Sequence, residues 1–226
     1  MINKLLSAAV KLYLRSQVEQ GSNLQVKVWG KNKQILQGYI PQVFLSCDRP
    51  IYQGLHLGYV ELKGGNIAIN LPEVLKRKPL RLLEPVFVDL QLKLDADDLS
   101  ASLESELLQS GLNDLWQLIV ASQSASPVSD LAIAWQDIAI NQGRLILTGS
   151  YQNSSNEMAE IRLLSDLSLA DQHTLCLSNL KFTNKPPFPG TFQESLKIDL
   201  GRDVAISKLI VESEQIICAG KIRINN

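Results

Sequence analysis

The most regular pattern of apolar and polar positions lies in the middle of the chain, at residues 86–95. Aliphatic side chains stand at every second position, at Val86, Val88, Leu90, Leu92 and Leu94, and mostly polar ones lie between them. Successive side chains of a strand point to opposite faces of a sheet, so this spacing places one face on a core and the other in water. The pattern predicts a half-buried antiparallel strand.

A helical pattern follows directly. Asp95 is expected to cap the helix, with the Asp98 carboxylate near its positive amino end. Apolar side chains then recur at helical spacing, at Leu99, Leu103, Leu107, Leu108, Leu112, Leu115, Trp116, Leu118, Ile119 and Val120. Because glycine is a poor helix former, the pattern fits either one long helix or two helices that meet at Gly111. A helix this apolar must pack against a sheet, another subunit or lipid.

Three stretches have the pattern of a β-hairpin, at residues 24–40, 132–151 and 204–224. In each, two apolar strands flank a polar turn, and the second strand contains an aliphatic run followed by glycine, as in ILQGYI, LILTGSY and IICAGKI. Three explanations stay open: one hairpin type used three times, an old duplication, or ordinary glycine-kinked strands.

The chain as a whole is expected to form one elongated domain over residues 1–226. The polar segment SQSASPVSD at residues 122–130 is the best internal boundary, because it separates an N-terminal half with helices from a predicted C-terminal β-meander. Within the meander, three prolines exclude regular structure from FTNKPPFPGTFQ at residues 182–193. Its Phe182, Phe188 and Phe192 either contact a membrane or partner or pin the loop to the domain.

The first twenty residues predict an amphipathic helix. Its apolar face carries Ile2, Leu5, Leu6, Ala9, Leu12 and Tyr13, whereas Lys4 and Lys11 lie away from that face. A basic amphipathic helix can lie in the plane of a membrane with its apolar face buried at the acyl boundary. It can equally pack on the sheet of its own domain, and both interpretations stay open.

Charge is distributed unevenly along the chain. The formal net charge is −1, which argues against non-specific binding of nucleic acid. Residues 1–94 carry 13 Lys+Arg against 6 Asp+Glu, whereas residues 95–130 carry no cation against 7 carboxylates. The densest basic cluster is Lys76, Arg77, Lys78 and Arg81. It fits either a contact with anionic lipid headgroups or a solvated loop.

Catalytic and metal-binding patterns are nearly absent from the sequence. His56 and His173 are the two histidines, each among aliphatic residues, and no phosphate-binding or dinucleotide-binding glycine motif is present. Cys47, Cys176 and Cys218 are far apart in apolar runs, as expected of reduced thiols in a reducing compartment. No signal peptide or transmembrane segment is recognised. We expect a non-enzymatic protein without cofactor or metal, cytoplasmic and peripheral on a membrane.

Four short motifs carry a resemblance to a known family. IYQGLHL at residues 51–57, NIAIN at 66–70, KPLRLL at 78–83 and DADDL at 95–99 resemble the cyanobacterial branch of the DUF2993 family, also called the LmeA-like phospholipid-binding family. The similarity covers about the first 120 residues well and the later half more weakly. It implies an α+β, tubular lipid-binding-like fold, in which an elongated, highly curved antiparallel sheet wraps around a long helix.

The resemblance also implies binding or transfer of phospholipid or glycolipid through an apolar groove at a membrane surface. The alternative is a peripheral scaffold or assembly factor that binds a membrane-protein partner. Because no family motif defines the lipid contacts, residue chemistry alone selects the candidates. For acyl chains these are Val86, Val88, Leu90, Leu92, Leu99, Leu103, Leu107 and Trp116; for headgroups or membrane, Lys76, Arg77, Lys78, Arg81, Lys4 and Lys11.

Overall fold

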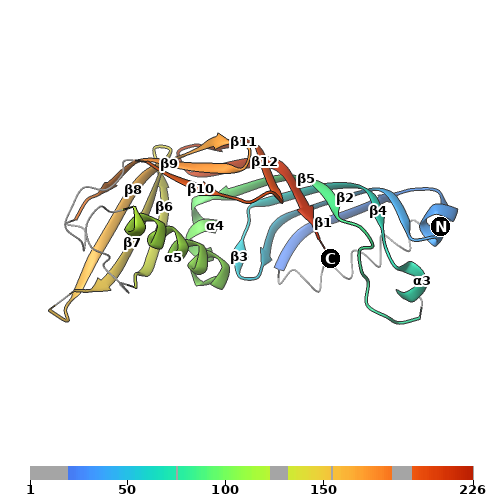
Figure 1. Ribbon diagram of the computed structural model, residues 1–226, viewed down its shortest axis with the longest axis horizontal. Coiled ribbons are helices and arrows are strands. Elements are labelled where there is room, and N and C mark those ends of the chain that lie inside the picture. Colours follow the sequence, from blue (N-terminus) through green and yellow to red (C-terminus); the bar gives the residue numbers. More distant parts are fainter. Residues whose placement is uncertain (1–19, 75, 123–131, 154, 185–194, 226) are drawn as a thin grey trace.

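The computed structural model describes residues 20–74, 76–122, 132–153, 155–184 and 195–225. They form an elongated, mostly β molecule whose strands belong to two antiparallel sheets, one toward each end of the long axis (Figure 1). The predicted N-terminal helix, with Lys4 and Lys11, lies outside the described residues, and so does most of the predicted boundary at residues 122–130.

The larger sheet has seven strands. They are β1 (Gln20–Trp29), β2 (Tyr39–Tyr52), β3 (Leu55–His56), β4 (Tyr59–Ala68), β5 (Val86–Asp95), β11 (Val204–Val211) and β12 (Gln215–Ile224). They pair in the order β1-β2-β4-β5-β12-β11, and β3 pairs with β2. The last hairpin of the chain therefore completes a sheet that the N-terminal half begins.

The smaller sheet has five strands and is a simple meander. Its strands are β6 (Ala134–Asn141), β7 (Arg144–Gln152), β8 (Met158–Asp171), β9 (Thr174–Phe182) and β10 (Ser195–Asp199), in the order β10-β9-β8-β7-β6. The predicted C-terminal meander is confirmed for these strands. It is wrong for β11 and β12, because β12 pairs with β5 over its whole length.

In the described part of the chain, five helical segments connect the strands. They are α2 (Asn32–Leu36), α3 (Leu71–Val74), α4 (Ala96–Ala101), the 3₁₀ turn η1 (Ser102–Glu104) and α5 (Glu106–Ala121). The predicted cap of the central helix is confirmed, because the backbone N–H of Asp95 donates to Asp98 Oδ2 at 2.9 Å. Such a contact pairs a backbone donor that the helix itself leaves unpaired.

The central helical region breaks at Ser105 and not at Gly111. Ser105 has extended backbone angles, and its hydroxyl donates to the backbone oxygen of Gln53 at 3.0 Å. The hydroxyl of Ser102 accepts from the backbone N–H of His56 at 2.8 Å. Both serines are buried, so their hydrogen bonds tie the break to the segment that contains β3. Gly111 lies inside α5, and both sequence-based versions of this helix are wrong.

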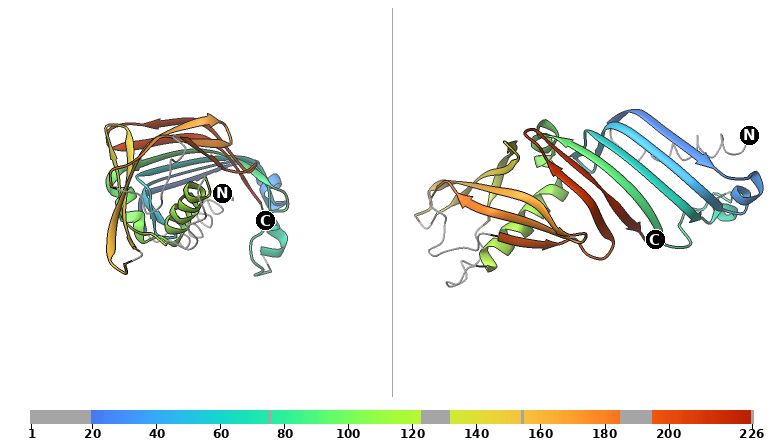
Figure 2. Two further views of the ribbon diagram at one scale, coloured as in Figure 1. Left: turned by 60° about the vertical axis from the view of Figure 1, so that its left-hand side comes forward. Right: turned by 90° about the horizontal axis from the view of Figure 1, so that it is seen from above.

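Helix α5 packs against the five-stranded sheet. Its buried Leu112, Leu115, Trp116 and Ile119 join residues of β6 to β10 in the main core. The Trp116 ring makes edge-to-face contacts with Trp135 and Phe182, each with centroids 6.4 Å apart. The expected single sheet curled around a long helix is therefore not found, since the helix lies against the second sheet (Figure 2).

The three predicted hairpins form, but the first differs in its connection. The turn between β6 and β7 has positive φ at Gln142 and Gly143, as a tight hairpin requires, and β11 and β12 pair as expected. Between β1 and β2 the chain inserts α2, whose Ile35 is buried with Val28 and Ile69 in a second, smaller cluster.

Candidate functional site

One face of the seven-stranded sheet is aliphatic across six strands. Residues directly opposite each other in an antiparallel pair share a face, so the strand register identifies its rows. The central row is Val26, Leu45, Leu62, Leu90, Gly220 and Ile206. A second row is Cys47, Val60, Leu92, Cys218 and Leu209, and a third is Val28, Val43, Gly64, Val88, Ile222 and Val204. We call this surface the aliphatic face.

The aliphatic face carries side chains without charge, and it is long. Five spacings of about 4.8 Å separate six strands, so the central row spans roughly 24 Å. Half the hydrocarbon core of a bilayer is about 15 Å thick. Val86 and Val88 are buried on this face, whereas Leu62 and Leu90 at its centre are half-buried. The face is therefore long enough to lie alongside an acyl chain.

The opposite face of the same strands is mostly polar, and several of its charges are paired with one another. Lys63 Nζ lies 2.7 Å from Glu61 Oε1, and Lys221 Nζ lies 3.8 Å from Asp89 Oδ1. The amines of Lys27 and Lys63 lie 5.8 and 5.7 Å from the ring centroid of Phe44. The hydrogen bond from Lys63 lowers the pKa of Glu61, despite an opposing effect of burial. This face suits water, so the sheet has one polar and one apolar side.

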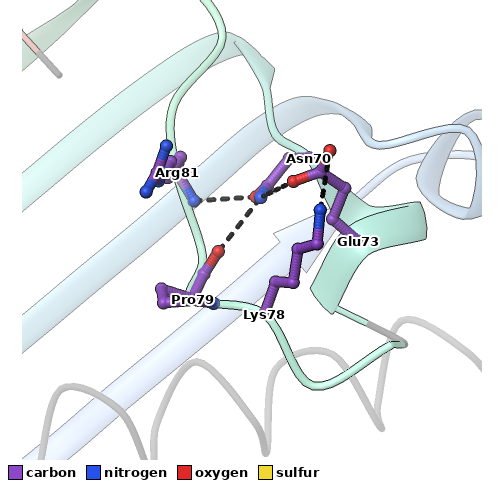
Figure 3. Close-up of polar contacts among 5 residues, drawn as sticks. All are labelled: Asn70, Glu73, Lys78, Pro79 and Arg81. Carbon is purple, nitrogen blue, oxygen red and sulfur yellow. Dashed lines mark hydrogen bonds and ion pairs between the residues drawn. The ribbon is translucent and has the colours of Figure 1, made fainter.

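The basic cluster lies in a loop between α3 and β5, at the end of the sheet. The loop is organised by the buried Asn70 (Figure 3). Its side-chain amide donates to the backbone oxygen of Pro79 at 3.0 Å, and its side-chain oxygen accepts from the backbone N–H of Arg81 at 2.7 Å. Lys78 lies 3.8 Å from Glu73. These contacts leave the side chains of Lys76, Arg77, Lys78 and Arg81 exposed.

Comparison with known protein families identifies the chain. The profile of a family described as LmeA-like phospholipid-binding matches residues 1–221. The chain belongs to the LmeA-like phospholipid-binding family. No curated protein and no solved structure matches it significantly. The family is a lipid-binding one, which agrees with an aliphatic face of this size, and the cyanobacterial branch stays a prediction.

The structure divides the predicted acyl-chain residues of this LmeA-like protein between two places. Val86, Val88, Leu90 and Leu92 lie together on the aliphatic face. Leu99, Leu103, Leu107 and Trp116 belong to the helical region on the other sheet: Leu99 and Trp116 are buried in its core, Leu103 packs against that core and Leu107 is exposed. The two sets therefore do not form the groove between strand and helix that the sequence suggested.

Sequence reasoning missed most of the aliphatic face. The residues that β4 and β12 contribute were not selected. In β12, Ile216, Cys218, Gly220 and Ile222 lie at every second position, but Ile217 and Ala219 between them are also apolar, so the alternation is weaker than in β5. What the sequence did not show was that β12 pairs with β5, so the two apolar sets were not recognised as one surface.

Other hollows in the described part of this family member are less suited to acyl chains. One of them, about 1020 Å³ in volume, lies between the two sheets and is lined by residues that include the carboxylates Asp95, Asp97, Glu212 and Glu214. Among the described residues, no group of three or more His, Cys, Asp or Glu side chains could hold a metal ion. Burial raises the pKa of the Cys47 and Cys218 thiols, which disfavours the reactive thiolate.

Phe182 packs against the core beside Trp116, so this end of the proline-rich loop is pinned to the domain. Phe188 and Phe192 lie outside the described residues. In the part of the chain that the structure describes, every helix is too short or too polar to cross a membrane.

Proposed function

We propose that this protein binds phospholipid and carries it, with acyl chains laid along the aliphatic face of the seven-stranded sheet. Membership of the LmeA-like phospholipid-binding family supports the class of ligand. The location of the lipid site is supported by the strand register, which brings aliphatic side chains from six strands onto one side of the sheet. These strands are β1, β2, β4, β5, β12 and β11.

The energetics favour this surface over a polar site. Each CH₂ group removed from water contributes about 0.8 kcal/mol, so a chain of a dozen such groups gains roughly 10 kcal/mol before the costs of ordering it. No directional polar partner is needed for that gain. A face made of Val, Leu and Ile, with a polar reverse side that keeps the sheet in contact with water, meets this requirement.

The experiment compares two tryptophan variants at adjacent positions of β5. Leu90→Trp places an indole at the centre of the aliphatic face, beside Leu62, whereas Gln91→Trp places the same side chain on the polar face. If the indole at position 90 keeps two CH₂ groups of a bound acyl chain away from the aliphatic face, binding weakens by about 1.6 kcal/mol, or roughly fifteenfold in affinity. Native mass spectrometry of gently purified protein, followed by lipid extraction, measures the bound phospholipid.

We expect stoichiometric phospholipid in the wild type and in Gln91→Trp, and a strong loss in Leu90→Trp. Bare polypeptide in the wild type, with no uptake from vesicles on re-exposure, would contradict the proposal. That outcome would move the search to a protein partner at the membrane, as a scaffold or assembly factor requires. Equal loss in both variants would mean that the tryptophan damages the sheet, and not that it fills a lipid site.

A further inference from the structure

Two segments come together at the end of the seven-stranded sheet that lies away from the five-stranded one (Figure 1). One is the connection at residues 29–38, which contains α2, and the other is the loop at residues 69–85. The backbone N–H of Ile69 donates to Gly38 O at 2.8 Å, and Ile35 packs in one cluster with Ile69, Leu71 and Leu82. We call these two segments the tip.

The tip is rich in exposed apolar side chains. Ten large hydrophobic residues of the described chain are exposed, and four of them belong to the tip: Trp29, Leu36, Leu80 and Leu83. The side chain of Leu83 is 62% exposed and that of Leu80 is 44% exposed. Because Asn70 fixes the backbone at Pro79 and Arg81, the loop holds Leu80 at the surface between two anchored positions.

The same surface is basic, and its cations are mostly unpaired. The tip carries six cations, Lys31, Lys33, Lys76, Arg77, Lys78 and Arg81, against the two carboxylates Glu73 and Glu84. Among the described residues, Lys78 is the one tip cation in a salt bridge, with Glu73. The polar face of the sheet differs, since Lys63, Lys93 and Lys221 each lie within 4 Å of a carboxylate. The tip cations other than Lys78 are thus without a salt bridge in the described structure and can meet an external anion.

The rest of the molecule has charge of the opposite sign. Residues 96–122, which contain α4, η1 and α5, carry five carboxylates and no cation. An anionic surface attracts the tip and repels this helical region, so it would orient the long axis with the tip toward it. Exposed leucines among cations match a lipid surface, where apolar side chains enter the interface and cations meet the headgroups.

We propose that the tip is a docking surface for an anionic lipid bilayer. In this arrangement Leu80 and Leu83 enter the interface, and Lys76 and Arg81 lie at the level of the phosphates. The inference rests on the proposed lipid-carrying function for its purpose, because docking would bring the aliphatic face to the membrane. Vesicle binding and carried lipid are nevertheless separate quantities, and each is measured by itself.

The test is flotation of the full chain with two kinds of vesicle, phosphatidylcholine alone and phosphatidylcholine with about one-third phosphatidylserine. We expect binding to the anionic vesicles and much weaker binding to the neutral ones. The double variant Lys76→Glu/Arg81→Glu is expected to bind the anionic vesicles at least roughly twentyfold more weakly, because each cation at such a surface contributes about fivefold in affinity. Leu80→Ser/Leu83→Ser is also expected to bind more weakly.

Two matched controls change the same chemistry elsewhere. Lys181→Glu/Lys197→Glu reverses two exposed cations of the five-stranded sheet, and Leu107→Ser/Leu118→Ser removes two exposed leucines of α5. Both are expected to bind anionic vesicles like the wild type. Failure of the wild type to bind anionic vesicles would overturn the inference. It would also be overturned if the tip variants lost no more vesicle binding than these controls.

Tryptophan fluorescence gives an independent measurement. Of the three tryptophans, Trp116 and Trp135 are buried in the core, whereas Trp29 at the tip is exposed. Anionic vesicles should shift the emission of the wild type to shorter wavelength, and the shift should vanish in Trp29→Phe. A shift that survives this substitution would overturn docking through the tip. Anionic vesicle binding by a protein that carries no lipid would leave the docking inference standing and contradict only the proposed function.

Discussion

Gly220 shows how closely β11 approaches β12 in the seven-stranded sheet. A Cβ atom at this position would lie 2.4 Å from Ala205 O and 2.9 Å from the Cα of Ile206, both of them backbone atoms. A backbone contact this short cannot be relieved by a side-chain rotation, so the strand itself would have to move. Glycine at this position also leaves the central row of the aliphatic face without a side chain between Leu90 and Ile206.

The same substitution at two glycines should therefore have opposite effects on stability. Gly220→Ala is expected to lower the free energy of unfolding by about 1–3 kcal/mol, because the added methyl group overpacks the strand contact. Gly111→Ala, inside α5 with no atom within 4 Å of its Cβ position, is expected to raise it by about 0.5–1 kcal/mol. Urea unfolding of both variants measures the difference, and two effects of the same sign would contradict this packing.

At the scale of elements, a polar network joins three strands of the five-stranded sheet. The amide of Asn179 on β9 donates to Asp166 Oδ2 on β8 at 2.6 Å, and Arg144 Nε on β7 donates to Asp166 Oδ1 at 2.9 Å. The hydrogen bond from Asn179 is the largest cause of a lowered pKa of Asp166, and the hydrogen bond from Arg144 lowers this pKa further. The folded state therefore favours the ionised carboxylate.

This network predicts a dependence of stability on pH. A carboxyl group whose pKa is lowered on folding stabilises the folded state at pH values above its pKa in the unfolded chain, here near the ordinary 3.8. This stability is lost as the pH falls through the lower pKa of the folded state. Unfolding by urea at a series of acidic pH values should show that Asp166→Asn loses less stability than the wild type over this range. The control is Asp137→Asn on β6, a carboxylate without a salt bridge among the described residues; it should follow the wild type. If the free energy of unfolding depended on pH in the same way for Asp166→Asn and the wild type, the network would not be the source of the acid sensitivity.

The elements predicted best from sequence are those whose signal is local. The alternation from Val86 to Leu94 predicted β5, and Asp95 with Asp98 predicted its transition into a helix. The break at Ser105 depends on a hydrogen bond to Gln53, a residue far away in the sequence, so composition pointed to Gly111 instead. A serine before Glu106 was nevertheless a usable cap signal, because serine is favoured at that position.

At the scale of the whole molecule, the pairing of β12 with β5 decides the candidate site. It joins the end of the chain to its first half and places Cys218 and Ile222 beside Leu92 and Val88. Alternation specifies which side of each strand is apolar but not which strands become neighbours. Four of the eight acyl-chain candidates, those of β5, therefore lie on the aliphatic face, whereas Leu99, Leu103, Leu107 and Trp116 belong to the helical region on the second sheet.

The most direct test of lipid carriage on this face is photo-crosslinking with a phospholipid that bears a photoreactive group in its acyl chain. The purified protein is loaded from vesicles, irradiated and mapped by peptide mass spectrometry. Crosslinks should fall on alternating residues of β4, β5 and β12, such as Leu62, Leu90 and Ile222, and spare Glu61, Gln91 and Lys221 on the polar face. Crosslinks confined to α5 and the five-stranded sheet, or spread equally over both faces, would contradict the account.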